Sequence, residues 1–152
     1  MLGNLVSDEA RSWIGRSAPS WTVEIHRSDI VKYSIATEQR LDKYRKGDEA
    51  PPMFFYGALR VLAPIDELGP DGLAMDAFLP DLPLKRVMAG GTKSHYLCAV
   101  KPGDVLVATR TLSGITEKQG ATGPLIFIQY ELTVTTDSGM PVMTETLTRI
   151  VR

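Results

Sequence analysis

The side chains best suited to acid–base chemistry in this sequence are its two histidines, His26 and His95. A histidine titrates near neutral pH, so either ring could exchange protons with a substrate. His95 follows the Gly90-Gly91 pair on an expected inner strand, from which its ring would reach a pocket beside a buried helix. A hydrogen-bonded structural role for His95 is the alternative. His26 lies between an expected strand and an expected helix, and we assign it a surface role.

Composition and charge bound the other kinds of chemistry. Cys98 is the only cysteine, so an internal disulfide is excluded; we expect a core position, because no nearby base would activate its thiol. The 17 basic and 18 acidic residues give a net charge of −1 without a long block of one sign, so neither nucleic acid nor a membrane is an expected partner. We expect no metal and no cofactor. The 152 residues predict one domain over 1–152, and the lack of a signal peptide or a membrane-length apolar run predicts a cytoplasmic protein.

The apolar stretch PPMFFYGALRVLAP at 51–64 is the element that must position any site. Proline is tolerated in the first turn of a helix and Pro64 would end one, so the stretch predicts a helix of about three turns over 53–63. A helix that is apolar on every side is surrounded by protein. Arg60 would then need a partner at the edge of the core or at a subunit interface.

The remaining pattern predicts an α+β fold. Before the central helix we expect a helix over 8–14 capped by Ser7, a strand over 22–25, a helix from Asp29 to about Thr37 capped by Ser28, and a polar loop over 38–50. The buried face of that second helix would carry Ile30, Val31, Ser34 and Ile35. After it, strands are expected over 84–100, 105–118, 125–136 and 142–151, with turns at KPGD, QGATG and DSG and a bulge at Gly90-Gly91. An antiparallel sheet would wrap around the central helix.

Seven segments occur in an order that resembles a known family. They are SWIGRS (12–17), KGDEAPPMFF (46–55), DELGPDG (66–72), FLPDLPLKRVMAGG (78–91), PGD (102–104), EKQGATGPLIFI (117–128) and the closing G-x-x-V-x-T-E-T (139–146). Together they resemble the N-terminal repeat of MaoC-like hydratases of the mesaconyl-CoA hydratase and hydroxyacyl-thioester dehydratase type. The resemblance implies a hot-dog fold and the reversible hydration of an enoyl thioester of CoA or of a carrier protein.

The catalytic pair that the resemblance implies is absent. The family's Asp and His occur as D-x-N-x-x-H before the central helix, but 29–52 contains no histidine, and neither Asp42 nor Asp48 has one at that spacing. In two-halved relatives the pair lies in the C-terminal repeat. We therefore expect this chain to be the non-catalytic or substrate-shaping half of a hydro-lyase, paired with a second hot-dog chain that carries the Asp and His. The alternatives are a self-sufficient homodimeric hydratase or thioesterase using His95, and a non-enzymatic module that binds acyl-CoA or another small ligand.

Substrate-binding candidates also follow from the resemblance. A CoA ester carries phosphates, which the basic side chains of Arg86, Lys93, Arg110 and Lys118 could meet; a solvated surface charge is the alternative for each. The N–H groups of Gly90 and Gly91 could stabilise a thioester oxyanion, or the pair could serve only as a bulge. Tyr56, a polar exception on the central helix, completes the set.

Overall fold

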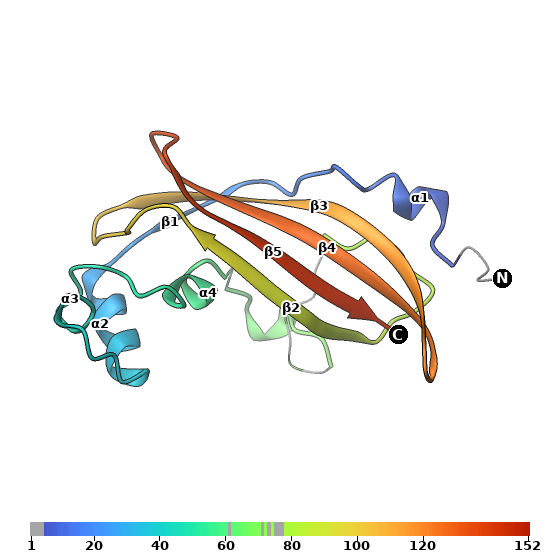
Figure 1. Cartoon of the computed structure of the whole chain (residues 1–152), viewed down its shortest axis with the longest axis horizontal. Coiled ribbons are helices and arrows are strands. Elements are labelled where there is room, and N and C mark those ends of the chain that lie inside the picture. Colours follow the sequence, from blue (N-terminus) through green and yellow to red (C-terminus); the bar gives the residue numbers. More distant parts are fainter. Residues whose placement is uncertain (1–4, 61, 71, 73, 75–77) are drawn as a thin grey trace.

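A computed structural model describes residues 5–60, 62–70, 72, 74 and 78–152 of the chain. The strands are β1 Trp21–Glu24, β2 Val87–Tyr96, β3 Val105–Gly120, β4 Gly123–Thr136 and β5 Pro141–Val151. The helices are α1 Asp8–Arg11, α2 Arg27–Ala36, α3 Asp42–Arg45, α4 Phe54–Ala58 and the 3-10 helix η1 Ile65–Glu67. Figure 1 shows one long, bent sheet with α2, α3 and α4 near one end and α1 near the other. The predicted α+β class is confirmed.

The sheet is antiparallel throughout, in the order β1-β3-β4-β5-β2. The predicted strands and turns are confirmed, including the short strand near residue 22. The expected inner position of β2 is wrong, because β1 occupies the free side of β3 and, in the part of the chain that the structure describes, β2 pairs with β5 alone. β2 is therefore an edge strand.

Alternation along the strands gives the sheet two different faces. In β4, Ile126, Ile128, Tyr130 and Val134 are all buried, and we call their side of the sheet the inner face and the opposite side the outer face. Near β1, the inner face packs against α2 and α4 through a cluster that includes Ile30, Phe54, Phe55, Leu106 and Met143. Near α1, it packs against a second cluster that includes Val6, Ala10, Leu82, Leu112 and Ile128.

The central helix is shorter and less enclosed than the sequence predicts. It spans Phe54–Ala58 instead of 53–63, and it buries Phe54, Phe55 and the following Leu59. On its other side Met53 is 57% exposed and Tyr56 49% exposed, so within this chain protein does not surround the helix. Gly57 lies inside the helix, where it weakens helix formation, and no side chain caps the start.

Arg60 is exposed in this chain, and it finds a partner on the same segment. Its guanidinium lies 5.0 Å from the centre of the Tyr56 ring and donates to the Tyr56 hydroxyl at 3.3 Å. The two polar side chains on this otherwise apolar segment, Tyr56 and Arg60, are thus each other's partners.

The N-terminal helices follow the sequence in part. Ser7 caps α1 as predicted, its Oγ accepting from the Ala10 N–H at 3.1 Å. The predicted Ser28 cap of α2 is wrong, because α2 begins at Arg27 and the cap position is His26, which makes no side-chain capping bond. Ile35 is 71% exposed rather than buried, since only Ile30 and Ser34 of α2 are fully covered. The expected loop over 38–50 contains α3, and the Ser34 hydroxyl donates to the Tyr44 carbonyl at 2.9 Å to join the two helices.

Gly57 gives the first testable prediction. Its φ is not in the left-handed region, and a Cβ built on it would meet no atom within 4 Å. We expect Gly57→Ala to stabilise the chain by about 0.5–1 kcal/mol, because alanine loses less backbone entropy on folding. Urea unfolding measures the change. Gly90→Ala is the contrasting control: its Cβ would lie 2.9 Å from the Thr148 carbonyl, so it should destabilise, and equal behaviour of the two variants would contradict the argument.

Glu117 ties the N-terminal segment to β3 and gives the second prediction. Its carboxylate accepts from the Val6 N–H at 2.9 Å, the Leu5 N–H at 3.2 Å and the Arg11 guanidinium at 2.8 Å. The Val6 N–H above all, then Leu5 and Arg11, hold the pKa of Glu117 below its ordinary value of 4.5. A lowered pKa means that the stabilisation is complete above the unfolded-state pKa and is lost as the pH falls through the folded-state pKa.

We therefore expect Glu117→Gln to lower the melting temperature by a few degrees at neutral pH. The gap from the wild type should narrow as the pH falls below the ordinary pKa of a glutamate and close once the pH is below the folded-state pKa. Melting curves across the pH range measure this. The exposed Glu67 provides the control, since Glu67→Gln should change little at any pH. A gap for Glu117→Gln that stays constant down to about pH 3 would contradict the account.

Candidate functional site

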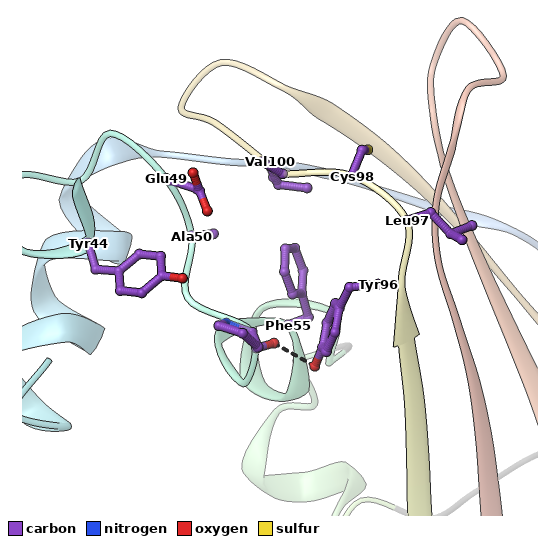
Figure 2. Close-up of a pocket in the computed structure, with 10 residues that line it drawn as sticks. Tyr44, Glu49, Ala50, Phe55, Tyr96, Leu97, Cys98 and Val100 are labelled. Atoms are coloured by element: carbon purple, nitrogen blue, oxygen red, sulfur yellow. Dashed lines mark hydrogen bonds between the residues drawn. The ribbon is translucent and has the colours of Figure 1, made fainter. Parts of the chain in front are cut away.

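A pocket of about 240 Å³ lies between α4, the end of β2 and the segment before α4 (Figure 2). Tyr96 forms one wall: its ring packs 6.1 Å from that of Phe55, and its hydroxyl donates to the Pro52 carbonyl at 2.8 Å. Cys98 also lines the pocket. It is half-buried and packs at the margin of the core cluster near β1 instead of inside it. Its thiol donates to the Pro141 carbonyl at 3.6 Å. Tyr96 thus fixes the inner face of β2 against α4.

A second pocket, of about 290 Å³, lies between β1, α2 and α4. Val23, Tyr33 and Phe54 supply apolar walls, while Glu24 and Asp29 add carboxylates. Gly57 opens its α4 side, since no side chain fills that position. The α4 helix therefore stands between two partly open spaces.

A row of four residues, three of them polar, crosses the inner face between the two apolar clusters, and we call it the inner row. Register places Ser94 of β2, Glu145 of β5, Leu132 of β4 and Arg110 of β3 side by side, and all four are half-buried. The Ser94 hydroxyl donates to Glu145 Oε2 at 2.9 Å. Polar atoms on the packed face of a sheet are costly unless they are bonded, which makes this inner row the best candidate for contact with a polar ligand.

The arginines of this face are held against aromatic rings. The guanidinium of Arg110 lies 4.9 Å from the centre of the Tyr130 ring and 5.4 Å from that of Phe78, and the Arg149 guanidinium lies 5.6 Å from the Tyr130 ring. Tyr130 is fully buried, and its hydroxyl donates to the Phe78 carbonyl at 2.8 Å. Such stacking fixes the direction of both guanidiniums.

His95 does not point where the sequence predicts. Its neighbour Tyr96 packs on α4, and since side chains alternate along a strand, His95 lies on the outer face, opposite the exposed Thr144. Lys93 shares that face, in register with Thr146 and Glu131. The expectation that the His95 ring reaches a pocket beside the helix is therefore wrong, because the inner-face positions of β2 fall on Ser94 and Tyr96 and not on His95.

The Gly90-Gly91 bulge is present, with a register shift between Ala89 and Gly91. Gly90 is required by packing, since a Cβ would collide with Thr148 and Ile150 of β5. Gly91 has a φ of 138°, which residues other than glycine rarely adopt. Close packing alone accounts for both glycines, and an oxyanion role stays a prediction.

The other predicted binding residues fall into separate places. Arg86 and Lys118 lie at the same end of the sheet on the outer face, whereas Tyr56 lies on α4 near the opposite end. Sequence reasoning missed Glu145 as a candidate. The alternation of the strand could have revealed it, because in VMTETLTRIV Glu145 lies on the same side as the apolar Met143 and Leu147.

Among the described residues, no strand pairs with the edge of β2 that faces away from β5. Eight of its ten residues are exposed, all but Met88 and Ser94. Val87, Tyr96 and the following Leu97 are large apolar side chains that are 47%, 39% and 49% exposed. Unpaired backbone groups beside exposed apolar side chains favour the addition of another strand.

Two classes of site are not found in the described residues. Within the ranges given above, no three His, Cys, Asp or Glu side chains gather so as to hold a metal ion. None of the described helices combines the length and apolar character that crossing a membrane requires.

Comparison with known proteins now gives the family. The model for the FAS1-like dehydratase domain region matches residues 12–145, and the chain belongs to this family. No curated protein matches the chain significantly.

Solved structures give the fold. The chain is similar to a chain of the ChsH1-ChsH2 complex from Mycobacterium tuberculosis at 15% identity and a TM-score of 0.69, covering 88% of this chain and 87% of that one. It is similar to the MaoC-like dehydratase from Rhodospirillum rubrum at 14% identity and a TM-score of 0.59, covering 91% of each chain. It is also similar to the HadBC (3R-hydroxyacyl-ACP dehydratase) complex from Mycobacterium tuberculosis at 14% identity and a TM-score of 0.57, covering 91% and 96%. The predicted hot-dog fold is confirmed.

Proposed function

We propose that this chain is the substrate-shaping subunit of an acyl-thioester hydratase or dehydratase, and that a second hot-dog chain supplies the Asp and His. The substrate is an enoyl or hydroxyacyl thioester of CoA or of a carrier protein. The cytoplasmic location and the single-domain organisation stay predictions from the sequence.

The open β2 edge is the observation that carries this proposal. β2 pairs with β5 on one side only, and its exposed apolar residues flank unpaired backbone groups. A strand from a second hot-dog chain would satisfy those groups and extend the sheet across the interface. Two of the similar structures, ChsH1-ChsH2 and HadBC, are complexes of two named components, which supports a partner of the same fold.

The inner row supplies the chemistry that this chain would contribute. Ser94 lies on the edge strand itself and Glu145 on the next strand, so a substrate bound at the β2 interface would meet both. The carboxylate of Glu145 can accept a hydrogen bond from a hydroxyl or a water, which is the group added or removed in this reaction. The partner's base would activate the water that becomes this hydroxyl, and its acid would deliver the proton to the α carbon.

Reconstitution tests the proposal. The chain is expressed alone and together with a hot-dog chain that carries D-x-N-x-x-H and is encoded beside it, and hydration of crotonyl-CoA is followed by the loss of enoyl-thioester absorbance. We expect turnover only from the pair, which should elute as one complex. Rapid hydration by the chain alone would refute the division of labour, and inactivity of a stable pair on every enoyl thioester tried would refute the activity.

Glu145 and His95 make a matched comparison for the third prediction. In the active pair, Glu145→Gln should raise KM or lower kcat by about tenfold, because it weakens one charge-assisted hydrogen bond to the substrate. His95→Ala should change either constant by less than about twofold, since its ring lies on the outer face. Steady-state kinetics measure both variants. The reverse result, with His95→Ala abolishing turnover, would support the self-sufficient enzyme instead.

A further inference from the structure

The pocket of about 290 Å³ between β1, α2 and α4 takes no part in the proposed function. β1 lines this pocket, and β1 and β2 are the opposite borders of the sheet. A strand that a second chain adds to β2 therefore lies at the other border. We call this space the β1 pocket; Figure 1 shows α2 and α4 together at one end of the sheet.

The walls of the β1 pocket are mostly apolar. Ile25 and Phe54 are buried residues of the core, and the Tyr33 ring meets the Phe54 ring edge to face at a centroid distance of 5.7 Å. On the α4 side the lining residue Gly57 leaves the space unfilled, since a Cβ built on it would meet no atom within 4 Å. Such walls favour a ligand that buries a short apolar stem.

The charged part of the lining is negative. Glu24 of β1 and Asp29 in the first turn of α2 line the pocket, and the described lining residues include no lysine, arginine or histidine. His26 and Lys32 each place a nitrogen 3.9 Å from one of these carboxylates, at the outer limit of an ion pair. Exposed pairs of this kind contribute little, so both carboxylates can accept a stronger partner.

We propose that the β1 pocket binds a small organic cation, an ammonium or guanidinium group on a short apolar stem. The stem packs against Phe54, Tyr33 and the bare side of α4 at Gly57. The cation contacts the carboxylates of Glu24 and Asp29. An anion of the same size is repelled by both carboxylates, and a neutral molecule gains the apolar contact alone. This inference does not rest on the proposed function.

The volume of the pocket limits the size of the ligand. About 290 Å³ is at the lower end of the range for ligand sites, so a nucleotide-sized molecule does not fit. Three of the five residues of α4, namely Phe54, Gly57 and Ala58, line the pocket. A cation bound there holds a helix whose start has no side-chain cap, and a ligand of the folded chain alone raises its stability.

A titration of the whole chain followed by amide chemical shifts in NMR tests the site. The probes are benzylamine, its neutral counterpart benzyl alcohol, and the anion benzoate. We expect benzylamine to bind with a Kd of about 1 mM or lower, benzyl alcohol to bind about five to ten times more weakly, and benzoate not to bind. Benzylamine at ten times its Kd should raise the melting temperature by about 4 °C.

Two variants separate the apolar contact from the charged one. Gly57→Leu fills the pocket from α4 and should abolish the binding of benzylamine and of benzyl alcohol. Urea unfolding should find that variant at least as stable as the wild type, since leucine is the better helix former. Glu24→Gln/Asp29→Asn should weaken benzylamine to the level of benzyl alcohol, whose own affinity should not change.

The control is a second double variant with the same change in charge. Asp66 and Glu67 are exposed on η1 and are not among the lining residues of the β1 pocket, so Asp66→Asn/Glu67→Gln should leave benzylamine binding unchanged. Equal losses in the two double variants would show a general charge effect and overturn the site. So would benzoate binding as tightly as benzylamine, benzylamine binding that Gly57→Leu leaves intact, or no binding at about 10 mM.

The test also separates a free cation from a basic side chain of a second chain. The proposed partner adds its strand at β2, so the pair should bind benzylamine as tightly as the chain alone does. Displacement of benzylamine by the partner would overturn the free cation, because a side chain of the partner would then occupy the β1 pocket. Inactivity of the pair in hydration would leave the cation site standing, since its readouts do not involve turnover.

Discussion

Ser94→Pro should abolish both the association with the partner chain and the turnover of the pair. The Leu97 N–H donates to the Val142 carbonyl, and because paired residues alternate, the N–H of Ser94 faces away from β5 toward the open edge. Proline there removes a donor that only an added strand would use. We expect the affinity of the pair to fall by about 100-fold or more, measured by size-exclusion chromatography with light scattering and by crotonyl-CoA hydration.

Ser94→Ala is the matched control for this variant. It removes the hydroxyl that donates to Glu145 but keeps the outward N–H, so the pair should assemble normally. The circular dichroism of Ser94→Pro should match that of the wild-type chain, since the ladder to β5 is intact. Assembly of Ser94→Pro with wild-type affinity would show that the partner uses another surface.

Phe55→Ala should produce the largest loss of stability in α4. The ring is 5% exposed and packs against Phe54 and Tyr96, with centroid distances of 5.9 and 6.1 Å. Removing it leaves a cavity where α4 packs against Tyr96 of β2, at a cost of about 3–5 kcal/mol. The free energy of unfolding in urea measures the effect.

Met53→Ala is the comparison on the exposed side of the same segment. Its side chain is 57% exposed, so the isolated chain should lose less than about 0.5 kcal/mol. If the second chain covers this side of α4, Met53→Ala should weaken the pair while Phe55→Ala destabilises the chain itself. A cost below about 1 kcal/mol for Phe55→Ala would mean that α4 is not anchored as described.

The strands were predictable because their signal is local. Alternation in 125–136 and 142–151 and the glycine-containing turns predict β4, β5 and both hairpins, and Gly90-Gly91 predicts the bulge. The position of β2 was not predictable in the same way. Whether β2 pairs with β3 or β5 depends on β1 reaching the free side of β3, which is a contact between distant parts of the chain.

The central helix and the site show the same limit. The stretch 53–63 is apolar all round, and that pattern alone does not say whether the cover is this chain or another one. The face of His95 depends on the register of β2, which the bulge shifts. Ser94 and Glu145 are distant in sequence, and only the β2–β5 pairing brings them into a hydrogen bond.

The sheet order has a consequence for how the molecule assembles itself. β3, β4 and β5 are joined by short turns, so their contacts close small loops and can form early. The two border strands each attach to a segment far away along the chain, and each is retained from one side only. Opening of either border strand therefore breaks pairing on one side only, and a second chain that adds a strand to β2 would slow amide exchange there, because β2 would then be paired on both sides.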